Sequence, residues 1–399
     1  MTKNIINQSD KVIAKTYARI PVVFEKGSGC TLWDTDGKSY LDFVAGIAVC
    51  NLGHAHPLVA KAIAGQAEQL IHVSNLYYTI PQTELAEKLV ANSFADRVFF
   101  ANSGAEANEA SIKLARKYFS DKGETGRHRI ITMEKSFHGR TMATLTATGQ
   151  DKIKKGFAPV LEGFDYVPFN DIEALRDRLD PSVTCAVMIE PVQGEGGVRA
   201  PLPDYLKQVR QLCDDTGTLF IFDEIQTGMG RTGTLFAYEQ FGVEPDIMTL
   251  AKALGNGLPI GAMLAINRVM EAFGPGSHAS TFGGTPLVCA AAVTVLNQMI
   301  EGGVLEQGKK AGAYFKKRLQ WLKEKHEVIE DVRGAGLLLG LGLKINGGDI
   351  VRACFENGFI INCIQDTVLR FIPPLIVTET EIDRLIECLD GIFARTGLA

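Results

Sequence analysis

Short runs of apolar residues alternate with longer amphipathic segments from about residue 97 onward. The runs are continuous instead of alternating with polar residues, which is typical of parallel strands buried on both faces. The segments between them, such as EANEASIKLARKYF and PDYLKQVRQLCDDTG, have the pattern of helices with one apolar face. The expected strands are residues 97–100, 129–133, 185–190, 219–223, 246–250 and 261–266.

This alternation predicts an α/β fold, with a mostly parallel central sheet covered by helices and ligands bound at the carboxyl ends of its strands. Longer helical segments with few strands follow residue 286, which indicates a smaller α+β domain. Residues 22–44 have the pattern of an antiparallel hairpin. We therefore expect an N-terminal segment (1–57) packing with the small domain, a large ligand-binding domain (58–286) and the small domain itself (287–399).

Composition excludes several classes of protein. The chain has 399 residues, 46% of them hydrophobic and 22% charged, and its net charge of −5 is spread without long runs of one sign. Neither a nucleic-acid surface nor a membrane-binding patch is expected. Eight scattered cysteines, a polar N-terminus and the lack of a bilayer-length apolar run predict buried free thiols in a cytoplasmic protein.

Two charged residues stand at the ends of successive expected strands. Asp223 follows four apolar residues in LFIFD, and Lys252 is the only charged residue in TLAKALGNGLPIG. An isolated ammonium or carboxylate in such surroundings loses solvation energy unless something pairs with it. A structural salt bridge between the two would satisfy this need, and so would a bound ligand.

A turn into a helix follows the first expected strand at residues 102–105. The free N–H groups and the positive dipole end of such a helix suit a phosphate, although Ser103 and Glu106 could also be a capping box alone. A phosphate cradle, a carboxylate and an amine in one crevice match the needs of pyridoxal phosphate. The acid keeps the ring nitrogen protonated, and the amine bonds to the aldehyde.

Seven short motifs resemble one enzyme family and occur in its expected order. They are NSGAEANEA, FHGRT, EPVQGEGG, FDEIQTGMGRTG, LAKALGNGLPIGA, STFGGTP and LRFIPPL. Together they resemble the class III aminotransferases, which are pyridoxal-phosphate enzymes of fold type I. The resemblance extends over essentially the whole chain. It implies a fold type I α/β architecture and pyridoxal 5'-phosphate as the cofactor.

The resemblance also implies roles for residues around the cofactor. Lys252 matches the Schiff-base lysine, which shuttles a proton, and Asp223 matches the partner of the ring nitrogen. Gln226 matches a residue near the ring hydroxyl. The turn Ser103, Gly104 and Ala105 matches the phosphate site, with backbone groups of the last two as donors.

A further phosphate ligand is implied to come from another chain. Thr281 matches a residue that such enzymes contribute from the neighbouring subunit, which predicts a homodimer with shared active sites. No motif indicates a metal site, because the spacing of His54 and His56 is not accompanied by further ligands.

Phe137 matches the aromatic side chain stacked on the cofactor ring. Four residues are implied to bind the substrates: Arg140, Arg370, Glu195 and Ile47. Arg140 and Arg370 match arginines that bind carboxylates. Glutamate would occupy both arginines. Glu195 matches a glutamate that pairs with the arginine at position 370 when the donor reacts through a terminal amine, and moves away when glutamate binds.

The choice of terminal amine depends on residue 47. Ornithine-specific relatives have a tyrosine there, whereas Ile47 suits an acylated amine without charge, and the segment FVAGIAVCNLGHAHP resembles the acetylornithine-using group of the family. The expected reaction is transfer of the δ-amine of N-acetylornithine to 2-oxoglutarate, giving N-acetylglutamate 5-semialdehyde and glutamate in arginine biosynthesis. Alternatives are succinyl-diaminopimelate, succinylornithine, ornithine or 4-aminobutyrate as donor, an aminomutase, or a silent binding protein.

Overall fold

The computed structural model describes residues 1–395, and its largest sheet has seven strands in the order β4-β10-β9-β8-β7-β5-β6. Strands β9, β8, β7, β5 and β6 pair in parallel, whereas β10 runs antiparallel to both of its neighbours. All six expected strands are present in this sheet. Their bounds are β4 (Arg97–Ala101), β5 (Arg129–Met133), β7 (Thr184–Ile189), β8 (Leu219–Asp223), β9 (Ile247–Leu250) and β10 (Gly261–Ala265), and the edge strand β6 (Phe164–Val167) joins them.

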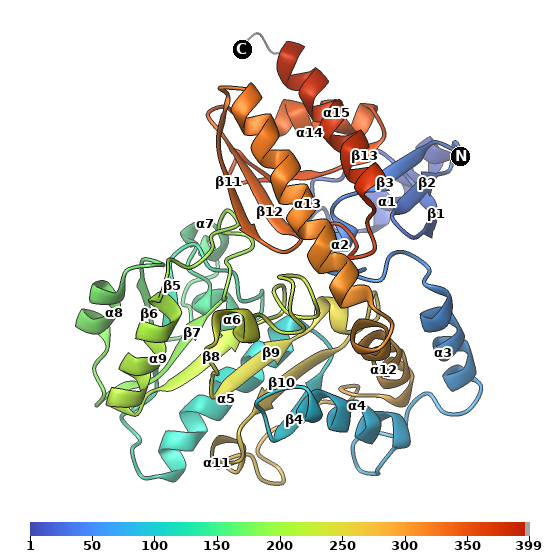
Figure 1. The fold of residues 1–399 in the computed structure, drawn as a ribbon. Helices are drawn as coiled ribbons and strands as arrows, with labels where there is room; N and C mark the ends of the chain where they lie inside the picture. Colours follow the sequence, from blue (N-terminus) through green and yellow to red (C-terminus); the bar gives the residue numbers. More distant parts are fainter. Residues whose placement is uncertain (396–399) are drawn as a thin grey trace.

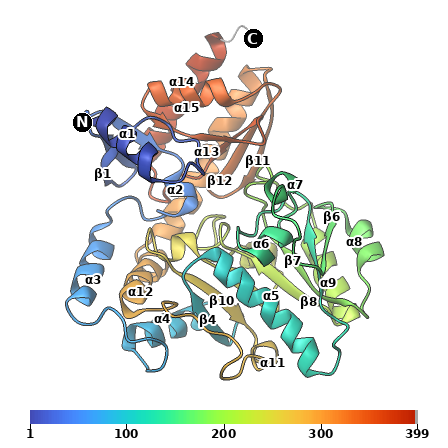
Figure 2. The same ribbon diagram turned by 180° about the vertical axis from the view of Figure 1, so that it is seen from behind.

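Helices cover both faces of this sheet. Helix α5 (Gly104–Asp121) crosses one face, as Figure 2 shows, whereas α8 (Ile172–Arg178) and α9 (Tyr205–Thr216) lie on the other (Figure 1). The strand residues of β7 and β8 are buried throughout, as continuous apolar runs between two helical layers require. The expected α/β fold class is confirmed.

Two smaller sheets form the upper part of the molecule in Figure 1. One joins the N-terminal hairpin region to the C-terminal part, because β3 pairs in parallel with β13. The other is antiparallel and carries α13, α14 and α15 beside it. The strands are β1 (Phe24–Ser28), β2 (Thr31–Asp34), β3 (Ser39–Asp42), β11 (Ile329–Ala335), β12 (Leu338–Leu343), β13 (Phe359–Ile360), β14 (Asn362–Ile364) and β15 (Val368–Phe371), and the helices are α13 (Val304–Lys325), α14 (Gly348–Glu356) and α15 (Glu379–Arg395).

Helix α12 (Pro286–Ile300) packs against α3 (Pro57–Ala67) and α4 (Ile80–Ala91), and most of its side chains are buried. Within residues 1–395, no single helix is long and apolar enough to cross a bilayer. Taken together, α12 and α13 meet the criteria of length and composition, but they are bent by 61°.

Short helices fill the connections, and all eight cysteines are free thiols. Five of these cysteines are buried, and the other three are partly exposed. The remaining helices are α1 (Thr2–Val12), α2 (Ala45–Ala48), α6 (Met142–Ala147), α7 (Asp151–Lys154), α10 (Ala237–Phe241) and α11 (Asn267–Met270), and a 3-10 turn spans Lys252–Leu254.

Candidate active site

A cavity of about 450 Å³ opens at the carboxyl ends of strands β4, β7, β8 and β9. It is lined by residues from each of these strand ends, including Ser103, Glu190, Asp223 and Lys252. Parallel strands deliver the side chains that follow them to one edge of the sheet, so residues up to 149 positions apart in the chain meet here. Asp223 and Lys252 therefore face the same cavity, as the sequence predicts.

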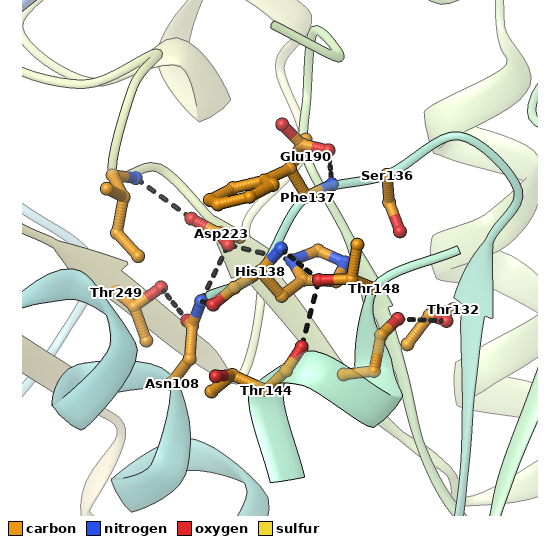
Figure 3. A network of polar contacts seen from close by, with 12 residues as sticks. Asn108, Thr132, Ser136, Phe137, His138, Thr144, Thr148, Glu190, Asp223 and Thr249 are labelled. Carbon is orange, nitrogen blue, oxygen red and sulfur yellow. Dashed lines mark hydrogen bonds and ion pairs between the residues drawn. The ribbon is translucent and has the colours of Figure 1, made fainter. Parts of the chain in front are cut away.

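Asp223 is held by a buried network of hydrogen bonds (Figure 3). Its Oδ2 accepts from Asn108 Nδ2 at 2.7 Å and from His138 Nδ1 at 2.8 Å, and its Oδ1 accepts from the Ile225 N–H at 3.1 Å. Asn108 is fixed in turn, because its Oδ1 accepts from Thr249 Oγ1 at 2.7 Å. Asp223 is only 3% exposed. Its carboxylate is therefore oriented before any ligand enters.

Lys252 lies two residues beyond the end of β9 and has a left-handed backbone, with φ of 47°. Burial lowers the pKa of its ammonium group, and the nearby Arg370 guanidinium lowers it further, whereas Glu195 and Asp223 act in the opposite direction. A lysine with a lowered pKa has a larger neutral fraction and is a better nucleophile and base.

The turn before α5 combines a helix cap with an open row of N–H groups. Ser103 Oγ accepts from the Glu106 N–H at 3.2 Å, and the Glu106 carboxylate accepts from the Asn102 N–H at 2.5 Å. Ser103 thus caps the helix while Glu106 bonds the N–H of the preceding residue, and Ser103, Gly104 and Ala105 still line the cavity. A Cβ on Gly104 would lie 2.8 Å from Ile225 Cδ1, so the close approach of these two segments requires glycine.

Phe137 and Arg140 lie together at the cavity wall. The Arg140 guanidinium carbon is 5.4 Å from the centre of the Phe137 ring, and both side chains line the cavity. The backbone N–H of Phe137 donates to Glu190 Oε2 at 2.9 Å, as Figure 3 shows. Glu190 Oε1 also accepts from the Gly194 N–H at 3.3 Å, so one buried carboxylate connects the aromatic wall to the loop that carries Glu195.

Glu195 and Arg370 form an ion pair beside Lys252. Arg370 Nη1 donates to Glu195 Oε1 at 2.5 Å, and the Arg370 side chain is 1% exposed while that of Glu195 is 30% exposed. Burial raises the pKa of Glu195, but the charge of Arg370 and its hydrogen bond outweigh this effect and lower the pKa below its usual value. Glu195, and not Arg370, lines the cavity.

Three residues expected at the site lie outside the cavity lining: Ile47, Thr281 and Arg370, the last of which contacts Glu195 in that lining. Ile47 is 45% exposed, and its place in the wall is taken by Val49 two residues later. Thr281 is exposed and lies near residues 72–82, away from this cavity. The remaining expected residues, Gln226 among them, line the cavity.

Three residues of the Asp223 network were not expected from the sequence. His138 and Asn108 stand inside two of the seven motifs, FHGRT and NSGAEANEA, whereas Thr249 is one residue before the end of β9. The signal that could have identified His138 and Asn108 was a polar side chain in a small-residue motif. Thr249 has no such signal, because only the pairing of β8 with β9 places it beside Asp223.

A model of the class III aminotransferase family matches residues 12–393. The chain belongs to the class III aminotransferase family. It is an aminotransferase, and the cofactor of this family is pyridoxal 5'-phosphate. Acetylornithine aminotransferase from Caldanaerobacter subterraneus subsp. tengcongensis is 54% identical over 391 residues, which are 98% of this chain and 99% of that protein. The same enzyme from Methanocaldococcus jannaschii is 54% identical over 395 residues, covering 98% of each chain.

Solved structures of related aminotransferases have the same fold. Ornithine aminotransferase from Toxoplasma gondii superimposes with a TM-score of 0.95 at 34% identity, covering 99% of this chain and 96% of that one. Acetylornithine aminotransferase from Elizabethkingia anophelis gives a TM-score of 0.88 at 34% identity, covering 99% of each chain. The fold type I architecture expected from the motifs is confirmed.

The residues present fit the cofactor. Gln226 has a buried Oε1 with no hydrogen-bond partner among residues 1–395, which suits the hydroxyl of a bound pyridine ring. The N-terminus of α5 offers N–H groups to a phosphate. The Asp223 carboxylate is already oriented, because Asn108 donates to it and is itself held by Thr249. Lys252 completes the set with an amine of lowered pKa.

Proposed function

We propose that this enzyme transfers the terminal amine of N-acetylornithine to 2-oxoglutarate, giving N-acetylglutamate 5-semialdehyde and glutamate. The observation that carries the proposal is the ion pair of Glu195 with Arg370 at 2.5 Å beside Lys252. A donor that reacts through a terminal amine has no carboxylate at the reacting carbon, so Arg370 needs another anion at that moment. The acetylornithine aminotransferases at 54% identity support the same donor. This reaction belongs to arginine biosynthesis.

The residues around the cofactor have separate tasks. When bound, pyridoxal 5'-phosphate supplies an aldehyde that condenses with amines and a ring that accepts an electron pair. Asp223 keeps a proton on the ring nitrogen, and Gln226 bonds the ring hydroxyl. The amine of Lys252 would take the proton from the substrate carbon that bears the reacting amine and pass it to the aldehyde carbon of the bound cofactor.

Arg140 and Glu195 distinguish the two substrates. Arg140 binds the carboxylate that lies farther from the reacting amine, both in N-acetylornithine and in glutamate. With N-acetylornithine, Glu195 stays on Arg370. With glutamate, the α-carboxylate takes the place of Glu195 on Arg370, because two carboxylates cannot share the guanidinium without repulsion. Val49 gives the acyl end an apolar border in the cavity wall, and Ile47 extends the apolar surface outside the lining.

The proposed assembly is a homodimer with shared sites. Thr281 lies next to a cluster of exposed apolar side chains of the kind that marks a protein interface. Asn75 Nδ2 donates to the Ser280 backbone oxygen at 3.0 Å, and the rings of His72 and Phe282 are 5.2 Å apart, so the cluster is one surface. Its members are Leu70, Ile71, Leu76, Tyr77, Tyr78, Ile80 and Phe282.

Hybrid dimers test this arrangement. A Lys252→Ala chain and a Thr281→Asp chain are each expected to be inactive alone, the second because its carboxylate repels the phosphate. Mixing them after dissociation should restore about a quarter of the wild-type activity, since half of the dimers are hybrids with one intact site. No recovery in a mixture that contains hybrids would contradict a shared site.

The sequence predicts a division into residues 1–57, 58–286 and 287–399, of which residues 396–399 lie outside the described part of the chain. We propose this division with one change. The packing of α12 on α3 and α4 supports placing α12 with the large domain, which moves the second boundary to residues 301–303. Eight free thiols, five of them buried, support a reducing compartment such as the cytoplasm.

Donor competition is the deciding experiment for the reaction. Steady-state kcat/KM would be measured with 2-oxoglutarate and each of N-acetylornithine, ornithine, succinyl-diaminopimelate, succinylornithine and 4-aminobutyrate. We expect the highest value for N-acetylornithine and a low value for ornithine, because Ile47 offers no partner for a free α-amine. A higher value for another donor would replace N-acetylornithine, and isomerisation of an amine without 2-oxoglutarate would indicate an aminomutase.

A further inference from the structure

The antiparallel hairpin of β14 and β15 contacts both partners of the Glu195–Arg370 ion pair. Arg370 lies on β15 directly opposite Asn362 on β14. The Asn362 amide oxygen is 3.3 Å from Arg370 Nε, and after rotation of the amide by 180° it accepts from Arg370 Nη2 at 2.8 Å. In either orientation an amide oxygen from the neighbouring strand holds the guanidinium. The arginine is thus positioned from within the hairpin itself.

The tip of the same hairpin reaches the other partner. Gln365 Nε2 donates to the backbone oxygen of Glu195 at 2.9 Å, although the two residues are 170 positions apart. The Gln365 side chain also lies against the next turn of that loop, because a Cβ on Gly197 would be 3.9 Å from Gln365 Cγ. This contact fixes the backbone at Glu195 and leaves its side chain free to turn.

Two residues at the hairpin tip, Gln365 and Asp366, have a backbone conformation that is unusual for residues other than glycine. Gln365 and Asp366 have φ values of 48° and 61°, in the left-handed region that favours glycine. A non-glycine residue is disfavoured there, and Gln365 more so than Asp366, because short polar side chains enter this region more readily. Such positions persist where the surroundings determine them, and they are concentrated at functional sites. At Gln365, a glycine would lack the side-chain amide that bonds the backbone oxygen of Glu195.

We propose that Gln365 and Asn362, presented by the hairpin of β14 and β15, act as one clamp on the Glu195–Arg370 pair and are positioning residues that set the preference between the two amine donors. Gln365 returns Glu195 to Arg370 and so favours the state used by the terminal-amine donor. Asn362 holds Arg370 in both states. This inference rests on the proposed function, because it assigns the two states to two substrates.

A pair of glycine variants separates the amide from the turn. Gln365→Gly and Asp366→Gly both relieve the left-handed backbone, but only the first removes the bond to Glu195. For Gln365→Gly we expect kcat/KM of the N-acetylornithine half-reaction to fall about three- to tenfold, the worth of one hydrogen bond, while that of the glutamate half-reaction is kept or rises. Asp366→Gly should match the wild type in both.

Binding of glutarate gives a readout without turnover. This dicarboxylate lacks an amine and needs Arg370 free of Glu195, so its Kd, measured by calorimetry on the holoenzyme, should decrease about three- to tenfold in Gln365→Gly. In Asn362→Ala the same Kd should increase, and both half-reactions should slow, because the guanidinium loses its support in either state.

Equal losses in both half-reactions of Gln365→Gly, or an unchanged glutarate Kd, would overturn the clamp. A change in Asp366→Gly equal to that in Gln365→Gly would assign the effect to the turn, which also overturns it. Failure of the proposed function is recognised separately, since it requires that the wild-type enzyme does not transaminate N-acetylornithine. The glutarate measurement still tests the clamp in that case.

Discussion

Two carboxylates flank Lys252, and the protein holds them in opposite ways. Asp223 is 3% exposed and accepts three hydrogen bonds, from Asn108, from His138 and from the backbone of Ile225. The side chain of Glu195 is 30% exposed, and among residues 1–395 only Arg370 bonds its carboxylate. Asp223 ends a strand of the central sheet and is held by several groups. Glu195 lies on a loop, and its carboxylate is held by one ion pair with Arg370.

The difference follows from the tasks that we assign to the two groups. The proton on a ring nitrogen is needed in both half-reactions, so a carboxylate fixed in advance costs no reorganisation. The partner of Arg370 is needed in only one half-reaction, so a strong but single ion pair can be exchanged for a substrate carboxylate. A rigid and an exchangeable charge thus act on the same lysine.

Lys252 is needed in both half-reactions, so its replacement should cause the largest loss of activity. In Lys252→Ala we expect both half-reactions to fall by about 10⁴-fold or more, because the amine that moves the proton is lost. Borohydride should no longer attach the cofactor to the chain, as measured by intact mass. Covalent attachment in this variant would show that another lysine forms the bond.

The rigid side is tested by Asp223→Asn, which preserves shape and removes the charge. We expect both half-reactions to fall together, by about a hundredfold or more, because a preorganised charge is lost from a buried site. Asp246→Asn is the matched control, since Asp246 is also buried but bonds Arg210 at the other end of the sheet. The control should lose stability and keep its kcat. A loss confined to one half-reaction of Asp223→Asn would contradict the comparison.

Replacement of Glu195 should change the rates of the two half-reactions unequally. In Glu195→Gln we expect the N-acetylornithine half-reaction to slow by about ten- to a hundredfold, because Arg370 is left without a buried counter-charge. The glutamate half-reaction should be retained or faster. Single-turnover rates with each substrate measure both. Equal effects would mean that Glu195 acts like Asp223, as a fixed charge.

Glu190 connects the two sides through the backbones of Phe137 and Gly194, and it should give the smallest effect. Burial raises its pKa to about 7, an increase to which the charge of Asp223 contributes. The folded protein therefore holds this proton more tightly than the unfolded chain. Its contribution to stability is complete below the ordinary glutamate pKa of about 4.3 and is lost as the pH rises through about 7.

Glu190→Gln should consequently flatten the decline in the free energy of unfolding between about pH 5 and pH 8. Urea denaturation at a series of pH values measures this slope. Glu330→Gln, which changes an exposed glutamate on β11, is the control and should keep the slope of the wild type. An unchanged slope in Glu190→Gln would show that folding does not raise the pKa of this carboxyl group.

Local patterns predicted the strands and helices that carry most of the site. The run LFIFD became β8 and the segment after NSGA became α5 because apolar periodicity and a capping residue act over a few neighbouring positions. Strand β6 (Phe164–Val167) was not predicted, since its four residues include the charged Asp165 and it pairs on one side only. Its formation depends on the edge offered by β5.

The site was predictable where a motif holds several chemical residues, and not where its residues meet only through the fold. Asp223 and Lys252 could be named from their position after apolar strands. Thr249 beside Asn108 could not, because that contact joins residues 141 positions apart. The position of Ile47 relative to the cavity likewise depends on how residues 45–50 turn, with several backbone angles in the left-handed region.

The sequence by itself determined the layered α/β architecture, the order of the motifs and hence the family and its cofactor, because these depend on local periodicity and residue type. Only the tertiary structure decided that Gln365 holds the loop of Glu195, and that Asp223 is locked by Asn108 and His138. Each of these is a contact between distant segments. Its distance is set by the packing of sheets and loops, which no short stretch of sequence contains.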